Sequence, residues 1–142
     1  MSSRAFAFSF SALLAIATVT GCSGGSSNSG QILFGTAIDT SNFTVTTPVT
    51  TIKTGADLGW VAYLNDSVNG TTMTLTVALV GNGGAETNVA TVPVSVSDPN
   101  FNEFAHQPDT SLTSQDPGMY TLRYIRPSDS KVLAQGSIQI TP

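Results

Sequence analysis

The sequence predicts an all-β domain, and three observations point to this class. Charged residues make up only 10% of the chain, far below the ~25% of a typical soluble protein, and Ser and Thr take their place, which suits the solvent face of a β-sheet. Apolar and polar residues alternate with a period of two along several segments. Turn-forming residues separate these segments at short spacing. We therefore expect about seven strands arranged as a β-sandwich, with a small barrel as the alternative.

The clearest alternation occurs in 57–64, 71–80, 89–96, 118–126 and 131–140, and weaker strands are indicated at 32–38 and 43–52. Within 57–64 the pattern places Trp60 on the apolar face and Val61 on the opposite one. Pro93 has no amide hydrogen to donate, so its strand should lie at a sheet edge. The segment 98–116 is expected to be a polar loop, with at most one helical turn at 101–107.

The first residues have the features of a secretory signal. Arg4 provides a positive charge, an apolar stretch follows at 5–19, and small residues come next. Val19-Thr20-Gly21-Cys22 resembles the lipobox of bacterial lipoproteins, in which the signal is cut before the Cys and the thiol carries a diacylglycerol. Cys22 is the only cysteine of the chain, so it has no internal disulfide partner, and lipid attachment would explain its presence. A Ser/Gly/Asn stretch then forms an expected flexible tether.

This gives three expected parts: a signal peptide at 1–21, a tether at 22–30 that begins with the lipidated Cys22, and one folded domain at 31–142. Within the domain, Asp116-x-Gly118-x-Tyr120-x-Leu122 resembles the D-x-G-x-Y-x-C corner of immunoglobulin-like domains. The resemblance implies an immunoglobulin-like antiparallel β-sandwich that closes with a hairpin of 118–126 and 131–140. Leu122 replaces the disulfide Cys, so no disulfide is expected. A fold of this kind implies no particular chemistry.

The composition leaves little basis for catalysis, and we expect neither an enzyme nor a cofactor. The net charge is −4 with five basic residues, which argues against nucleic acid as a partner. His106 is the only histidine, and Asp109 lies three residues after it in the chain. A hydrolase built on this pair is the least favoured function, because no motif marks a nucleophile.

No metal site is expected, although one segment invites comparison with a calcium loop. A single histidine and an acylated cysteine cannot form a zinc site. Asp98, Asn100, Asn102 and Asp109 have the spacing of oxygen ligands in an EF-hand loop. However, Glu103 takes the place of the required Gly, and no helices flank the segment. The alternative is an Asp-Pro-Asn turn whose side chains bond the local backbone.

Phe101 and Phe104 are the candidate contact residues, since exposed aromatic side chains on a loop often mark a binding site. The alternative is that both fold back to cap the core. The sequence thus predicts a lipid-anchored protein of the bacterial cell envelope, with an extracytoplasmic, non-catalytic domain that binds a protein or polysaccharide or has a structural role in the envelope. Loops 65–70, 98–116 and 127–130 could carry the contact. A small inhibitor or an accessory subunit is the alternative function, and the ligand, the oligomeric state and the choice between inner and outer membrane stay open.

Overall fold

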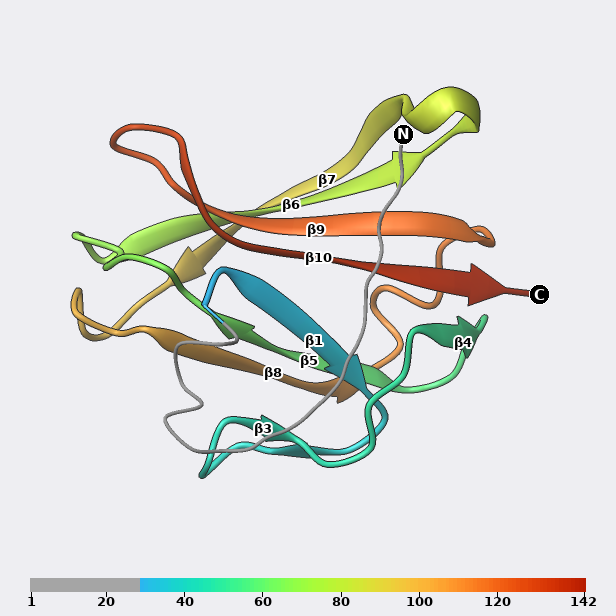
Figure 1. Cartoon of the computed structure of the whole chain (residues 1–142), viewed down its shortest axis with the longest axis horizontal. Helices are drawn as coiled ribbons and strands as arrows, with labels where there is room; N and C mark the ends of the chain where they lie inside the picture. Colours follow the sequence, from blue (N-terminus) through green and yellow to red (C-terminus); the bar gives the residue numbers. More distant parts are fainter. Residues whose placement is uncertain (1–28) are drawn as a thin grey trace.

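The computed structural model describes residues 29–142, and these residues form strands with one short 3-10 turn. The predicted signal peptide lies outside the described residues. The 3-10 turn, Asn82–Gly84, connects β6 to β7. The strands are β1 (Gln31–Gly35), β2 (Ile38–Asp39), β3 (Thr44–Val45), β4 (Thr51–Lys53), β5 (Leu58–Tyr63), β6 (Thr72–Val80), β7 (Glu86–Ser95), β8 (Glu103–Asp109), β9 (Gly118–Arg126) and β10 (Lys131–Thr141) (Figure 1).

Seven strands form one hydrogen-bonded path in the order β7-β6-β9-β10-β1-β5-β8, and β4 pairs with β10 beside it. β1 pairs with β5 along its whole length but meets β10 only at Gln31 and Gln135. The path folds over at this point into two layers, with β1, β5 and β8 in one and β10, β9, β6 and β7 in the other (Figure 1). These layers match the A-B-E and G-F-C-C′ strands of an immunoglobulin-like sandwich. The predicted fold is confirmed. Among residues 29–142, no strand pairs with the outer edge of β8, so the first layer has three strands.

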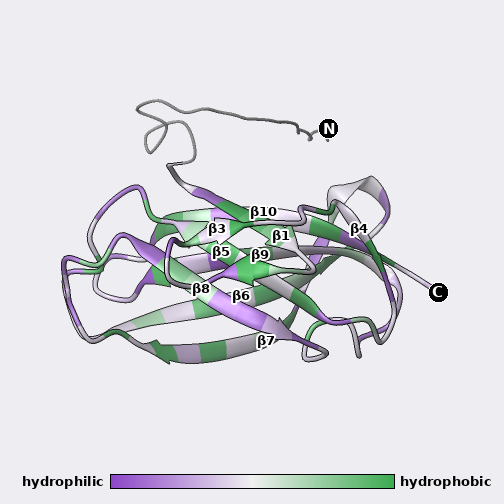
Figure 2. Ribbon diagram, turned by 90° about the horizontal axis from the view of Figure 1, so that it is seen from below, coloured by the Kyte–Doolittle hydropathy of each residue, from purple (hydrophilic) through white to green (hydrophobic). Residues whose placement is uncertain are grey.

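Buried aromatic side chains join the two layers. The indole Nε1–H of Trp60 on β5 donates a hydrogen bond to Tyr124 Oη on β9, at 2.9 Å. The ring of Phe104 on β8 packs edge-on against Tyr124, with 5.4 Å between centroids. The strands show the alternating hydropathy expected when one face packs on this core (Figure 2). Trp60 is therefore a core residue, as predicted, but it lies on the second strand of the sandwich and not on the third, which carries the core Trp of immunoglobulin domains.

The predicted corner motif is present. Tyr120 Oη donates a hydrogen bond to the backbone oxygen of Asp116, at 2.7 Å, which fixes the turn that leads into β9. Leu122 is fully buried at the position of the missing disulfide Cys. β9 and β10 form the predicted closing hairpin. The edge position of Pro93 is also confirmed, because β7 ends the path.

The structure corrects the expectation for 98–116. A strand, β8, replaces the predicted loop and helical turn at 101–107, because this segment pairs antiparallel with β5. The register places Phe104 opposite Ala62 and His106 opposite Trp60. His106 and Pro108 interrupt the apolar alternation of the segment, so the period-two pattern is weak, and the backbone pairing with β5 decides its conformation.

Two smaller corrections concern which side chains are buried. Val61 is fully buried, although the alternation places it on the polar side of β5. The weak pattern predicted long strands between β1 and β4, but this segment forms the β2–β3 hairpin. The hairpin packs on β5 and covers the side on which Val61 lies. In β10 a bulge between Val132 and Ala134 shifts the register. Val132 is exposed and Leu133 is buried as a result.

The strand registers place the connections at two opposite ends of the sandwich, which we call the tether end and the far end. β1 begins at the tether end, beside Tyr63 and Gln135. The connections 64–71, 96–102 and 127–130 lie there too, on the left of Figure 1. The far end carries the connections 54–57, 81–85 and 110–117 and the end of β10, on the right of Figure 1. The expected contact segment 98–116 thus spans both ends.

Candidate functional site

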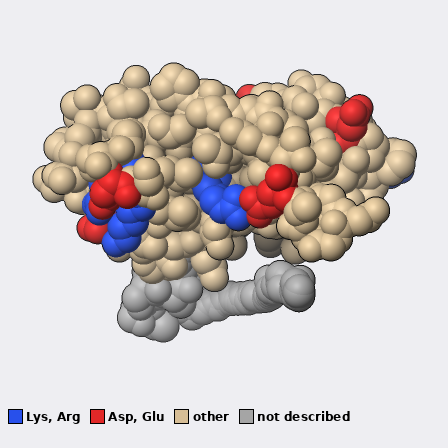
Figure 3. All heavy atoms as spheres, turned by 90° about the horizontal axis from the view of Figure 1, so that it is seen from above, with Lys and Arg blue, Asp and Glu red and all other residues tan. Residues whose placement is uncertain are grey.

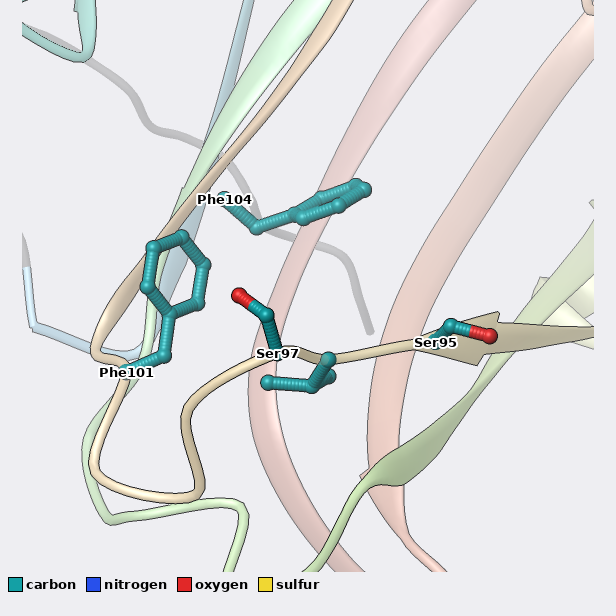
Figure 4. Close-up of a pocket in the computed structure, with 5 residues that line it drawn as sticks. Ser95, Ser97, Phe101 and Phe104 are labelled. Carbon is teal, nitrogen blue, oxygen red and sulfur yellow. The ribbon is translucent and has the colours of Figure 1, made fainter.

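Phe101 and Phe104 lie together at the tether end and flank a small recess. Phe104 is the second residue of β8, and Phe101 precedes that strand. Both side chains are half-buried and pack against the core. The recess has a volume of about 120 Å³ and is lined by Ser95, Val96, Ser97, Phe101 and Phe104. The Ser97 side chain points toward the two phenyl rings, whereas that of Ser95 points away from them (Figure 4).

Both readings of the two phenylalanines hold in part. Phe104 caps the core through its contact with Tyr124. Phe101 packs on Phe43 from the β2–β3 hairpin, with 5.7 Å between centroids and rings at 68°. Both rings also line the recess. The site can therefore offer apolar ring surface and the Ser97 hydroxyl to a partner, a combination typical of contact sites that bury an apolar group beside a polar one.

Phe43 is a site residue that sequence reasoning missed. Its backbone has φ 52°, an uncommon conformation for a bulky side chain that costs on the order of 1–3 kcal/mol. Tyr63 Oη donates a hydrogen bond to the Phe43 backbone oxygen, at 2.7 Å, and holds this turn against the tether end. Burial and the nearby Glu103 carboxylate raise the pKa of Tyr63 to about 12. No sequence signal marks Phe43, because the hairpin brings it to Phe101 from 58 positions away.

An ion-pair network joins two connections at the tether end. The Arg126 guanidinium contacts Asp66 at 3.2 Å and Asp129 at 2.8 Å, and Arg126 also donates to the Ser67 backbone oxygen at 2.9 Å. Lys131 contacts Asp66 at 3.0 Å. A hydrogen bond from Lys131 is the main cause that lowers the pKa of Asp66 to about 2, and a hydrogen bond from Arg126 does the same for Asp129. Charges are clustered and leave much of the visible surface uncharged (Figure 3).

His106 and Asp109 do come together, as the sequence allowed. His106 Nε2 lies 3.1 Å from Asp109 Oδ2, and the imidazole stacks on Trp60 with 3.9 Å between centroids and planes at 7°. Asp109 also accepts hydrogen bonds from the Ser111 hydroxyl and amide. Burial raises the pKa of Asp109, but the bonds from Ser111 and His106 outweigh it and lower the pKa below its ordinary value.

The order of these three groups differs from that of a nucleophilic triad. In a triad the imidazole lies between the hydroxyl and the carboxylate, whereas here the carboxylate of Asp109 lies between His106 and Ser111. The Asp109 contacts are those of a side chain that caps the turn after β8. We therefore assign these contacts to the local structure of the turn.

The four calcium candidates do not converge. Asp98 Oδ1 accepts a hydrogen bond from the Asn100 amide, at 2.9 Å, which is the local turn that the alternative reading described. Asp109 ends β8 while Asn102 precedes it, and the seven residue steps between them span about 23 Å at ~3.3 Å per residue. Within residues 29–142, no three Asp, Glu, His or Cys side chains gather as a metal ion would require.

Cys22, the predicted lipidation site, lies outside the described residues, but the structure shows where the chain leaves the domain. The Gly30 amide donates to the Tyr63 backbone oxygen at 2.6 Å, and the Gln135 amide donates to the Gly30 oxygen at 3.0 Å. Gly30 is therefore held at the tether end. Among the described residues, no helix is long and apolar enough to cross a bilayer.

Comparison with known proteins gives one structural neighbour to report. No family model matches the chain, and no curated protein matches it. The domain is similar to the crystal structure of an immunoglobulin-like protein from Pseudomonas aeruginosa, with a TM-score of 0.46 and 17% sequence identity, covering 79% of this chain and 93% of that chain.

Proposed function

We propose that this protein is a lipid-anchored module of the bacterial cell envelope that binds a partner without catalysing a reaction, and that the Phe101–Phe104 recess is the contact surface. The observation that supports the proposal is that two half-buried phenyl rings line a surface recess together with Ser97. Aromatic side chains, phenylalanine among them, are enriched in protein interfaces relative to the rest of the surface.

The arrangement of polar groups supports a binding role over a catalytic one. The imidazole of His106 is stacked on Trp60 and bonded to Asp109, and Asp109, not His106, accepts the hydrogen bond from the Ser111 hydroxyl. General-base catalysis needs the imidazole within reach of the group that it deprotonates. The recess itself is lined by phenylalanine, serine and valine side chains, which bind but do not titrate near neutral pH.

The lipid anchor is tested by replacing Cys22 with Ala in the producing cell. Fatty-acid labelling should be lost and the protein should no longer sediment with membranes, because the chain contains no other thiol. Labelling that persists in Cys22→Ala would contradict the anchor. Measurement of cleavage by mass spectrometry of the mature protein gives an independent check of the site.

The contact surface is tested by crosslinking on intact cells, with mass spectrometry of what is captured. Phe101→Ser removes one ring, and Ser97→Lys places a long charged side chain in the recess while leaving the core intact. Both variants should lose the partner captured by the unaltered protein. Val89→Ser is the matched control, because Val89 is 42% exposed on the same strand that leads to the recess but does not line it. Equal capture by all variants would overturn the proposed surface.

A further inference from the structure

We propose that the outer edge of β8 accepts an extended peptide strand of a partner, in which apolar residues alternate with basic ones. The added strand takes the fourth position of the three-strand layer, beside β8 and facing β7. This inference rests on the proposed binding function and deepens it, because it names the chemistry of the occupant. Free backbone groups on β8, an uncovered apolar side chain on β7 and acidic side chains around β8 support it independently.

The backbone of β8 presents free hydrogen-bonding groups along its outer edge. The Leu64 amide donates to the Asn102 oxygen at 2.9 Å, and in an antiparallel ladder every second residue bonds to the neighbouring strand. Asn102 and every second residue after it therefore bond to β5, while Glu103 and Ala105 direct their amide and carbonyl groups away from it. On that side the described part of the chain has no further strand. An extended backbone is the partner that matches such a row of donors and acceptors.

The other open edge of the sandwich is closed to such an addition. β7 ends the four-strand layer, and the Val96 amide donates to the Thr71 oxygen, so the alternation turns Pro93 outward. Pro93 has no amide hydrogen, and a bulge at Val89 interrupts the same strand. Proline residues and bulges protect sheet edges against strand addition. β8 has neither over 103–106, so β8 is the edge that is open to a partner.

A strand beside β8 also covers apolar surface that is otherwise exposed. Val92 of β7 pairs with Leu75, and Leu75 pairs with Tyr124, so the three side chains form one row on the inner face of their layer. Tyr124 and Leu75 are 1% and 8% exposed, whereas Val92 is 44% exposed, because β7 extends past β8 (Figure 2). The inward side chains of an added strand therefore meet an apolar surface, and the one opposite Phe104 points toward the recess.

The acidic side chains around β8 determine the charge of the partner strand. Glu103 begins β8 and Asp109 ends it, and Asp98 lies in the connection before it. Among residues 29–142, no lysine or arginine forms an ion pair with these three carboxylates, and the ion-pair contact of Asp109 is with His106. Basic side chains on the outward face of the added strand complement Glu103. A second copy of β8 is a poorer match, because self-pairing brings carboxylates together.

Binding of a defined peptide tests the strand addition on the protein purified from producing cells in a non-ionic detergent. The probe is a fluorescent peptide of alternating lysine and valine, seven residues long like β8, and its fluorescence anisotropy reports binding. In antiparallel addition, the peptide residues opposite Glu103 and Ala105 form the hydrogen bonds, and their side chains lie on the outward face. These residues are the lysines, because the valines face Val92.

N-methylation of the lysines should therefore weaken binding about tenfold or more, because it removes the hydrogen bonds to β8, whereas N-methylation of the valines should leave binding unchanged. Loss of binding with the valine set alone would support parallel addition at the same edge. Equal binding of the two N-methylated peptides, or no binding of the unmodified peptide, would overturn the inference. A peptide with glutamate in place of lysine should bind about tenfold more weakly, and equal binding would contradict the basic character of the partner.

Variants of the protein test the same edge from the other side. Ala105→Pro removes a free amide hydrogen without removing a bond to β5 and should abolish peptide binding. Thr91→Pro is the matched control, because Thr91 faces outward on the β7 edge, and should bind like the unaltered protein. Glu103→Gln should weaken binding of the lysine peptide about threefold. Unaltered protein that sediments as a dimer, and a monomeric Ala105→Pro, would show that β8 pairs with itself and would overturn the inference.

Crosslinking on intact cells separates this inference from the proposed function. Capture that is lost in both Phe101→Ser and Ala105→Pro supports a strand that reaches the recess. Capture that is lost in Phe101→Ser but kept in Ala105→Pro would leave the recess as the contact surface and overturn strand addition. Equal capture by both variants and the unaltered protein would contradict the proposed contact surface itself.

Discussion

Removal of one hydroxyl from the core tests how the two layers are held together. Tyr124 Oη is the acceptor for the Trp60 indole N–H, and the two side chains are 1% and 3% exposed. Tyr124→Phe keeps the ring and its contact with Phe104 but leaves the indole N–H without its acceptor. An unsatisfied buried donor costs about 1–3 kcal/mol. For a domain of this size the melting temperature should fall by about 4 °C per kcal/mol, or roughly 4–12 °C in total.

The free energy of unfolding is measured by urea denaturation, followed through the fluorescence of Trp60, the only tryptophan. The dependence of stability on urea should not change, because the variant exposes the same surface on unfolding. Trp60→Phe and the double variant, followed by circular dichroism, complete a cycle whose coupling energy should be about 0.5–3 kcal/mol. A loss below ~0.5 kcal/mol in Tyr124→Phe would refute the argument that this bond satisfies an otherwise unpaired donor.

Four further outcomes are expected from the structure. Tyr120→Phe removes the corner hydrogen bond at 2.7 Å and should lower the free energy of unfolding by about 0.5–1.5 kcal/mol in urea titrations. Gly136→Ala would place a Cβ 2.3 Å from the Ile32 backbone oxygen and should destabilise the domain far more than Gly70→Ala, whose nearest atom is 4.0 Å away; similar melting temperatures would contradict this. The pKa of Asp66 is lowered to about 2, so its stabilising effect is full above pH ~4 and lost as the pH falls toward 2; Asp66→Asn should flatten that acid limb in denaturation midpoints. The pKa of Tyr63 is raised to about 12, so its contribution is full below pH ~10 and lost as the pH rises toward 12. This alkaline loss should be smaller in Tyr63→Phe, where Tyr120 and Tyr124, whose pKa values burial also raises, still contribute.

The described domain shows which sequence signals were informative. The alternation in 71–80 and the corner at Asp116 to Tyr120 depend on neighbours within a few residues, and both are present. β8 was missed because its conformation depends on pairing with β5, more than 40 positions away in the chain. The burial of Val61 was missed for the same reason, since the hairpin that covers it comes from a different segment.

The candidate site also has one part that the sequence indicated and one part that only the structure shows. Phe101 and Phe104 could be named from composition, because two aromatic residues in a polar segment stand out. Their geometry could not, because the recess needs Ser97 from the connection after β7 and the support of Phe43 from the β2–β3 hairpin. For the four calcium candidates, the sequence suggested a site that the structure does not form. Their regular spacing along the chain suggested one site, but β8 is extended and places Asp109 far from the other three residues.

The sequence by itself determined the all-β class, the corner that begins β9, the edge position of Pro93 and the expectation of a lipid anchor at Cys22. These depend on local periodicity, turn chemistry and short motifs, which act over a few residues. Only the tertiary structure decided the three-strand and four-strand layers, the strand at 103–109, the recess at Phe101 and the end at which Gly30 joins the domain. Each of these depends on contacts between residues far apart in sequence, and such contacts leave no periodic trace in either segment alone.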